Sequence, residues 1–334
     1  MNKLIFKLFH ACLVFLLLVL VTISLASCIP SINGRAVDIP NETAKNPEAY
    51  FCPREDCSKA FEDNIKLANY SVHCALYDID LKNVIYSLSK KSKNADVKIV
   101  IDDTNNKGQI KGDGLRVDNE KQLMHNKFCV VDGYTVVTGS FNPTYNDNFK
   151  NNNNVVVIYS KALANNYENE FSELWNGIFG KGRTVKNPEM LINGVNIENY
   201  FCPEDNCESH IINLINNAKS DIYFMSFSFT NEAIADSLIK KSNLNIKGVF
   251  DSSQSSNKYS QFKRLKDFWL DVKLDKNKYK MHHKVFIIDN ETVVTGSFNP
   301  TLSAEEKNDE NVLIIHDKRI AKRFLDEFES LWPS

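Results

Sequence analysis

One pattern of chemically active residues occurs twice in this 334-residue chain. It reads H-x-K, four residues, D, six residues, then G-S-x-N, and both copies fill every fixed position. The copies contain His125, Lys127, Asp132, Ser140 and Asn142, and His282, Lys284, Asp289, Ser297 and Asn299. A lysine, an imidazole, a hydroxyl and a carboxamide can together bind a phosphate group and exchange protons with it. The repeat therefore predicts a phosphate site with its own acid/base group.

The residues around each motif are those of paired strands. Apolar runs after each H-x-K predict buried strands, and second strands end at each Gly-Ser: 128–131, 135–138, 285–288 and 292–295. Because side chains alternate along a strand, the His and Lys of each H-x-K share one face. Glycine at the end of the second strand lets the backbone approach a ligand closely. We expect Asp132 and Asp289 to hold the turns and neighbouring backbone, and His283 to face away from the site.

The order of the predicted elements also repeats. Helix, strand, helix and strand precede the first motif at 58–68, 71–77, 81–91 and 97–101, and the second at 208–218, 222–229, 232–241 and 246–250. Alternation of this kind predicts an α/β protein. We expect one repeat at 49–180, a linker at 181–196 and a second repeat at 197–334.

The second repeat contains an insertion before its motif. The offset between equivalent residues is 150 from Cys52 to Cys202 but 157 from His125 to His282. The additional residues fall around 252–269, in a segment rich in Ser, Gln, Asn, Lys and Arg. Two interpretations are open: a substrate loop over the site, or a solvated surface insertion.

Composition sets broad limits. Hydrophobic residues make up 43% of the chain, which is enough for sizeable cores. The 40 basic and 42 acidic residues give a formal net charge of −2. No global positive field therefore points to nucleic acid, although a local basic groove stays open.

The N-terminus has the pattern of an export signal. Lys3 and Lys7 precede an apolar run at 13–26, which predicts a signal peptide at 1–27. Residues 25–28 resemble a bacterial lipobox, which would make Cys28 the lipidated first residue of a mature lipoprotein, followed by a flexible tether at 28–48. Ordinary cleavage and an uncleaved anchor helix are the alternatives. We expect an exported protein that is anchored to a membrane.

Six cysteines follow Cys28. Four of them occupy equivalent turns as C-x4-C pairs, Cys52 with Cys57 and Cys202 with Cys207. In an exported protein these pairs predict two local disulfides, with a four-thiolate zinc site as the alternative. Cys74 and Cys129 lie in apolar strand-like runs, and we expect them to be inert core residues.

The doubled motif resembles the paired HKD motifs of the phospholipase D superfamily, and the likeness extends from near Tyr50 to the C-terminus. The resemblance implies two α/β/α repeats, related by a pseudo-twofold axis and packed around one shared active site. It also implies hydrolysis without a metal or another cofactor. One histidine attacks phosphorus and forms a phosphohistidine, and the other protonates the leaving oxygen and later activates water. In that family the first-motif histidine is usually the nucleophile, which assigns attack to His125 and acid/base duty to His282.

The remaining motif residues are expected to bind the phosphate. Its non-bridging oxygens would be held by Lys127, Lys284, Asn142 and Asn299, with Ser140 and Ser297 donating to the same group. Glu310 resembles the family's downstream acidic residue, which orients one imidazole. The first repeat departs from the family pattern by having Asn153 there. Glu310 supports His125 if these partners cross between halves; otherwise it supports His282, and the two histidines exchange roles.

The resemblance implies a phosphoric diester hydrolase. Its first interpretation is a phospholipase D that removes the head group of a phospholipid at the membrane and leaves phosphatidate. An exported endonuclease acting on single- or double-stranded nucleic acid and a cardiolipin-type hydrolase are alternatives with the same site. A scaffold that binds phosphorylated ligands is a third class, and the intact histidines and lysines argue against it. The sequence implies no obligate protein partner.

Overall fold

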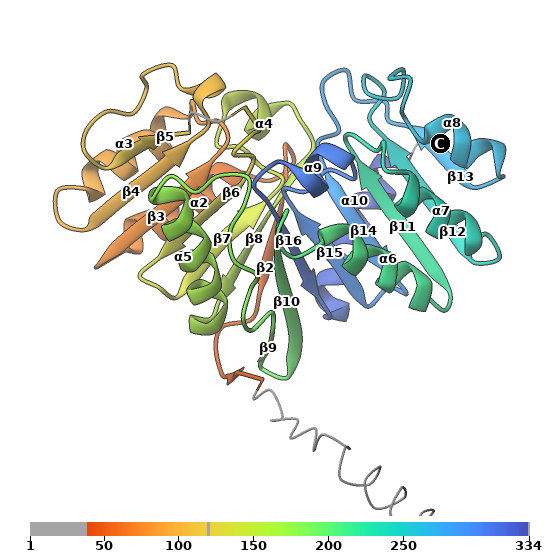
Figure 1. Cartoon of the computed structure of the whole chain (residues 1–334), viewed down its shortest axis with the longest axis horizontal. Coiled ribbons are helices and arrows are strands. Elements are labelled where there is room, and N and C mark those ends of the chain that lie inside the picture. The colour runs from red at the N-terminus through yellow and green to blue at the C-terminus, as the bar shows by residue number, and fades with distance from the viewer. Residues whose placement is uncertain (1–38, 119–120, 333–334) are drawn as a thin grey trace, which may run out of the picture. The chain divides into compact units, whose positions relative to one another are not determined.

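The computed structural model describes residues 39–118 and 121–332. Two β-sheets, each with its own helices, form the two halves of this region (Figure 1). The predicted signal peptide, Cys28 and the first part of the expected tether lie outside the described residues.

The first half follows the expected alternation of strands and helices. Its elements are β2 (Glu48–Cys52), α2 (Cys57–Leu67), β3 (Ser71–Leu76), α3 (Lys82–Lys91), β4 (Asp96–Ile101), η1 (Asp103–Asn105), β5 (Leu115–Val117), β6 (Lys127–Val131), β7 (Thr135–Gly139), α4 (Tyr145–Phe149), β8 (Asn153–Tyr159) and α5 (Lys161–Trp175).

The second half repeats this series. Its elements are β10 (Val195–Cys202), α6 (Cys207–Asn217), β11 (Asp221–Ser226), α7 (Glu232–Lys240), β12 (Asn245–Phe250), α8 (Phe262–Asp267), β13 (Asp271–Leu274), β14 (Lys284–Ile288), β15 (Thr292–Gly296), α9 (Leu302–Glu306), β16 (Glu310–Ile315) and α10 (Lys318–Leu331). Two further strands, β1 (Asn41–Glu42) and β9 (Glu189–Ile192), extend the edge of the second sheet.

The two sheets share one strand order. It runs β2-β8-β7-β6-β3-β4-β5 in the first sheet and β10-β16-β15-β14-β11-β12-β13 in the second. The motif strands β6 and β14 pair antiparallel with both of their neighbours. Strands β3 and β4 pair parallel, and so do β11 and β12. The expected α/β class and the duplication are confirmed.

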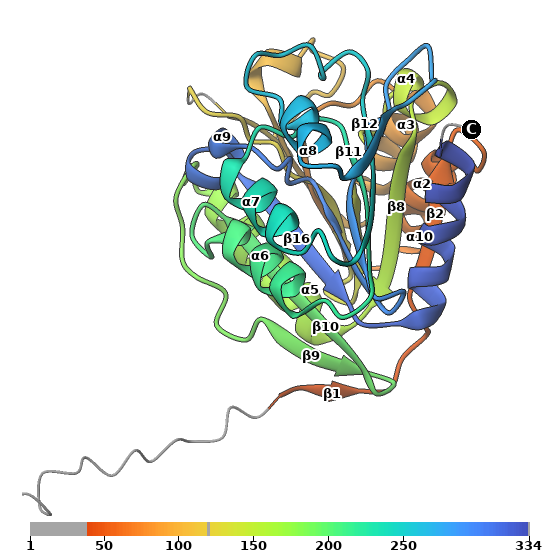
Figure 2. The same cartoon turned by 90° about the vertical axis from the view of Figure 1, so that its right-hand side faces the viewer.

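Helices cover both faces of each sheet. The pair α2 and α3 packs on the outer face of the first sheet, and α6 and α7 form the equivalent pair in the second half. Helices α5 and α10 cover the inner faces, where α5 also contacts β10 and α10 contacts β2 (Figure 2). The amphipathic α10 buries Ala321, Phe324 and Phe328 at this contact between halves.

One hydrophobic core spans both halves. Phe128 meets Tyr167 edge-on at 4.9 Å, and Tyr167 meets Phe201 of the second half at 5.0 Å. Phe51 and Phe324 form another edge-on pair across the halves, at 4.9 Å. These rings are all buried in the same cluster. Separating the halves would expose this aromatic core, so they form a single folding unit.

Three disulfides are present in the described part of the chain. The predicted bonds Cys52–Cys57 and Cys202–Cys207 are confirmed. The expectation that Cys74 and Cys129 are inert is wrong, because these residues also form a disulfide. They lie directly opposite each other on β3 and β6, with Cα atoms 4.1 Å apart. The equivalent pair in the second sheet is Phe224 and Phe286. Three such bonds are typical of an extracytoplasmic protein.

Parts of the expected linker and tether are ordered strands. Strand β9 forms a hairpin with β10 through Asn193 and Gly194, whose φ angles of 52° and 78° suit a tight turn. Strand β1 pairs parallel with β9, and the Ala44 N–H donates to Asn193 Oδ1 at 3.0 Å. The Glu42 carboxylate also accepts the first N–H groups of α5. Residues 41–44 therefore attach to the domain, at the end of the segment expected to be flexible.

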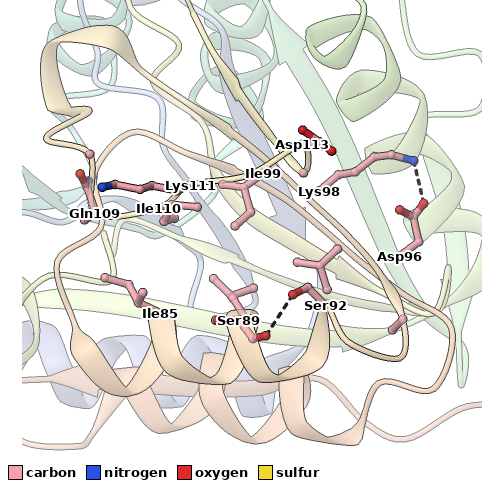
Figure 3. Close-up of a pocket in the computed structure, with 16 residues that line it drawn as sticks. Ile85, Ser89, Ser92, Asp96, Lys98, Ile99, Gln109, Ile110, Lys111 and Asp113 are labelled. Atoms are coloured by element: carbon pink, nitrogen blue, oxygen red, sulfur yellow. Dashed lines mark hydrogen bonds and ion pairs between the residues drawn. The ribbon is translucent and has the colours of Figure 1, made fainter.

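The insertion of the second half forms turns and the short helix α8. Leu265 of α8 is buried in the outer core, and Arg264 forms an ion pair with Asp236 of α7. Within residues 102–118 and 121–124, the shorter connection of the first half contains no α-helix. There, a cavity of about 630 Å³ lies between α3 and the loop at 108–114, with Ile85, Ile99 and Ile110 among its lining residues (Figure 3). Its lining contains no motif residue.

Candidate active site

The two motifs meet where the halves exchange backbone contacts. The His125 N–H donates to the Asp309 carbonyl at 3.0 Å, and the His282 N–H donates to the Asn152 carbonyl at 2.8 Å. Each contact lies next to an isolated bridge between the halves. Both histidines are thereby fixed where backbone segments of the two halves meet.

His125 is oriented by a carboxylate from the other half. Its Nδ1 lies 2.8 Å from Glu310 Oε2, and the Ser297 hydroxyl donates to the same oxygen at 2.6 Å. Glu310 is completely buried at the start of β16. An Nδ1–H that donates to this carboxylate leaves Nε2 available for chemistry.

His282 has the same arrangement with an amide. Its Nδ1 lies 2.9 Å from Asn153 Oδ1, and the Ser140 hydroxyl donates to that oxygen at 3.0 Å. Because an amide oxygen only accepts hydrogen bonds, Nδ1 of His282 carries the proton of this contact. Both imidazoles are therefore held across the halves, one by a charged partner and one by a neutral partner.

The motif serines bind the partners of the two histidines. Ser140 donates to Asn153 and Ser297 donates to Glu310. Each hydroxyl also accepts a backbone N–H, from Asn154 at 3.0 Å and from Asn311 at 2.9 Å. The hydroxyls thus connect neighbouring strands of one sheet and help to hold the partners of the histidines in place.

The two lysines bring cations into a buried site. Lys127 Nζ donates to the His125 carbonyl at 2.6 Å, and Lys284 Nζ donates to the His282 carbonyl at 2.7 Å. Burial lowers the pKa of Lys127 to about 8, although the nearby Glu310 and Asp147 charges oppose this change. Burial and then the Lys127 charge lower the pKa of Lys284 well below its usual value. Burial is thus the main influence on the pKa of both lysines, and the charge of Lys127 adds to it at Lys284.

Burial favours the neutral form of both imidazoles. Burial lowers the pKa of His125 to about 4 against the opposing charge of Glu310. Burial, followed by the charges of Lys284 and Lys127, lowers the pKa of His282 well below its usual value. A bound anion would reverse part of this effect, because negative charge favours the protonated imidazole.

An aromatic ring stands beside each motif. The Tyr77 ring meets the His125 ring edge-on at 4.7 Å, and the Phe227 ring meets the His282 ring at the same distance. Lys127 Nζ lies 4.9 Å from the Tyr77 centroid, and Lys284 Nζ lies 5.1 Å from the Phe227 centroid. Each ring limits the movement of one imidazole and one ammonium group.

Asp147 is a further residue of the site, and the sequence pattern does not reveal it. This buried carboxylate accepts the Asn142 backbone N–H at 2.9 Å and the Asn142 Nδ2 at 2.8 Å. It also lies 3.8 Å from His282 Nδ1. Its counterpart in the second half is Ala304, so a comparison of the two repeats does not reveal it. His282 therefore has a carboxylate nearby, although its direct partner is an amide.

Of the remaining motif residues, the two asparagines have an unpaired buried oxygen, while the two aspartates and His283 bind the surrounding protein. In the described part of the chain, Asn142 and Asn299 each have a buried Oδ1 without a hydrogen-bond partner. Asp132 and Asp289 accept three consecutive backbone N–H groups each, at 69–71 and at 219–221, beyond the opposite ends of the motif strands. His283 faces away from the site, where it contacts Asn154 and Glu327.

Metal ligation is not evident within residues 39–118 and 121–332. No group of three or more His, Cys, Asp and Glu side chains in these ranges is arranged to hold an ion.

Two α/β repeats that place paired H-x-K motifs in one centre define a duplicated fold with a shared site. The family model described as "Cardiolipin synthase, PLD-like domain" matches residues 61–175 and 211–332. The chain belongs to the phospholipase D superfamily.

Two relatives are similar to part of this sequence, and one solved structure is similar to its fold. A phospholipase D from Rickettsia prowazekii (strain Madrid E) is 34% identical over 140 residues, which is 40% of this chain and 67% of that protein. A mitochondrial cardiolipin hydrolase from Chlamydomonas reinhardtii is 28% identical over 141 residues, 39% of this chain and 63% of that protein. The match thus spans about two thirds of the length of these relatives. The structure of phosphatidylserine synthase from Haemophilus influenzae Rd KW20 has a TM-score of 0.66 at 13% identity, covers 85% of each chain and shows the fold alone.

Proposed function

We propose that the protein is a metal-independent phosphodiesterase of the phospholipase D type. It hydrolyses the head-group ester of a phospholipid and leaves phosphatidate, through a phosphohistidine intermediate. The observation that carries the proposal is the 2.8 Å contact between His125 and Glu310, because a nucleophilic imidazole needs a partner that stabilises the cation it becomes.

In the first step, Nε2 of His125 attacks phosphorus while the bond from phosphorus to the head-group oxygen breaks. His282 gives its Nε2 proton to the leaving oxygen, so the head group departs as a neutral alcohol. Glu310 stabilises the positive charge on the substituted imidazole of His125. Lys127 and Lys284 neutralise the non-bridging oxygens, which otherwise repel a nucleophile.

In the second step, water replaces the head group. His282, now neutral, takes a proton from water as the oxygen of that water bonds to phosphorus. The bond from phosphorus to Nε2 of His125 breaks, phosphatidate leaves, and His282 is again protonated. Over the two steps His282 gives one proton to the leaving oxygen and takes one from water, His125 exchanges none, and no redox change occurs.

The proposed location is outside the cytoplasm, at a membrane. The three disulfides favour an oxidising compartment. Among the described residues, no helix combines the length and apolar character required to cross a bilayer. The proposed anchor is the lipid on Cys28, which lies outside the described residues. A Cys28→Ala variant that partitions into detergent like the unaltered protein would show that this anchor is absent.

The function is tested on three substrates in the presence of chelator. Purified protein is incubated with phosphatidylglycerol, cardiolipin and single-stranded DNA, alongside His125→Ala and His282→Ala variants. The proposal expects release of phosphatidate from phosphatidylglycerol and its loss in both variants. Cleavage of DNA alone would instead identify an exported nuclease, and cleavage of cardiolipin alone a cardiolipin hydrolase. An absence of turnover on all three would contradict enzymatic function.

A further inference from the structure

The two histidines are bordered by short segments, some of them helical, that occupy equivalent places in the two halves. Residues 145–150 and 276–280, here called the basic rim, lead into Asn152 and His282. Residues 302–307 and 121–123, here called the opposite rim, lead into Asp309 and His125. Because both motif regions follow the same offset of 157, every residue of the opposite rim has a counterpart in the basic rim.

The chemistry of the two rims differs. The basic rim has four lysines, at 150, 276, 278 and 280, and its single acidic residue is the buried Asp147. The opposite rim has two lysines and two glutamates. Lys280 corresponds to Leu123, Tyr279 to Gln122 and Phe149 to Glu306. One side of the site is therefore cationic and aromatic, and the other is close to neutral.

The basic rim reaches the His282 side of the site. Lys280 Nζ lies 5.5 Å from the centroid of Phe227, the ring that meets His282 edge-on. Lys150 Nζ lies 5.3 Å from the centroids of both Tyr145 and Tyr279. The two segments of the basic rim are joined by hydrogen bonds. In one of them, Asn277 Nδ2 donates to the Lys150 carbonyl at 3.1 Å. The cations and the exposed rings are thus held together next to this histidine.

The direction of the reaction decides which part of the substrate meets this rim. This step rests on the proposed function, in which His125 attacks and His282 protonates the leaving oxygen. In a displacement at phosphorus the nucleophile and the leaving oxygen lie in line on opposite sides. The head group therefore extends from phosphorus toward His282 and passes the basic rim.

We propose that the basic rim selects phospholipids whose head group carries negative charge and disfavours a quaternary ammonium head group such as choline. An anionic head group is attracted to Lys150 and Lys280. A choline group would need aromatic faces for cation–π contacts, but protein lysines already lie over Phe227 and Tyr279. It would also be repelled by those lysines.

The test is a comparison of head groups on one surface. Phosphatidylglycerol phosphate, phosphatidylglycerol and phosphatidylcholine are presented to the full-length protein in micelles of neutral detergent at equal mole fraction. We expect kcat/KM to fall in that order, with the first exceeding the last by about tenfold at low salt and by less at 0.5 M salt. The ratio between two lipids on one variant cancels any general loss of activity.

Variants locate the preference. Lys280→Gln and Lys150→Gln should each reduce the ratio of the phosphorylated to the choline lipid about two- to fivefold, as expected for one exposed ion pair. Lys280→Glu should reduce this ratio further, because a negative charge at this position repels the phosphorylated head group and attracts the choline group. The matched controls are Lys121→Gln and Lys307→Gln, the counterparts of Lys278 and Lys150 on the opposite rim, and they should leave the ratio unchanged.

The outcomes separate this inference from the proposed function. Turnover of the soluble diester bis(p-nitrophenyl) phosphate, lost in His125→Ala, reports the function without a lipid head group. If that turnover is present but the lipids show no charge preference, the selectivity proposal is wrong and the function stands. The same conclusion follows if the opposite-rim variants change the ratio as much as Lys280→Gln does. If neither the diester nor any lipid is hydrolysed, both proposals are overturned.

Discussion

His125 and Glu310 lie in different halves of the chain, yet the imidazole Nδ1 and the carboxylate Oε2 are 2.8 Å apart in the buried centre of the molecule. The only comparable contact of His282, within the described residues, is with the neutral Asn153. One histidine therefore has a charged partner suited to a covalent intermediate, and the other has a neutral partner suited to losing its proton.

This asymmetry predicts which histidine is modified. Rapid quenching with a substrate labelled at phosphorus should place the label on His125, and Glu310→Gln should reduce the rate of labelling about 100-fold, because the cation that forms loses its partner. Peptide mapping of the labelled protein is the measurement. Glu306→Gln, an exposed change in the neighbouring helix, serves as the control. Label on His282 would reverse the assigned roles.

Asp147 is predicted to position the acid. Its removal in Asp147→Asn leaves the Asn142 contact possible but removes a negative charge 3.8 Å from His282 Nδ1. We expect kcat to fall about tenfold on a phospholipid, whose alkoxide needs the proton, and by much less on bis(p-nitrophenyl) phosphate, whose phenolate leaves without it. The matched control is Asp80→Asn. Asp80 is exposed and accepts the Tyr145 N–H at the start of α4, the helix that contains Asp147. An equal loss on both substrates would indicate a purely structural role.

The pH dependence should differ between free and bound enzyme. Burial lowers the pKa of His282 in the empty site, and a bound phosphodiester anion raises it again. The profile of kcat/KM reports the free enzyme and that of kcat reports the complex. The alkaline decline of kcat should therefore lie at higher pH than that of kcat/KM. Coincident declines would show that substrate binding does not change the pKa of this imidazole.

The disulfides should contribute unequally to stability. Cys74 and Cys129 are separated by 55 residues, whereas the cysteines of each local bond are separated by 5. In the chain-entropy model these separations correspond to about 4 and about 2 kcal/mol of unfolding free energy. Denaturant titration of a Cys74→Ala, Cys129→Ala variant should show a larger loss than titration of Cys52→Ala, Cys57→Ala. The opposite order would mean that packing at these sites outweighs chain entropy.

The sequence predicts well whatever is local and repeated. Period-two alternation and turn residues place the motif strands within a residue or two of β6, β7, β14 and β15. The strands β2 and β10 are missed, because each ends at a Cys-Pro that reads as the turn before a helix. Their pairing with β8 and β16 depends on partners more than 100 residues away in the chain.

Features that depend on register or on one half alone are not accessible from the sequence. The Cys74–Cys129 bond requires β3 and β6 to pair in one register, which neither strand specifies by itself. The hydrogen bonds from the motif serines to the histidine partners depend on the pairing of neighbouring strands, which the motif alone does not specify. Asp147 is not predicted, because a comparison of the two repeats identifies only the residues that occur in both.

The crossed pairing of the histidines has a consequence for how such a site can diverge. In an assembly of two identical subunits, replacing the carboxylate partner by an amide would change both imidazoles at once. Here positions 153 and 310 are encoded separately, so one can keep its charge while the other loses it. Because the two halves belong to one chain, the two histidines can have different partners and different roles, which two identical subunits could not provide.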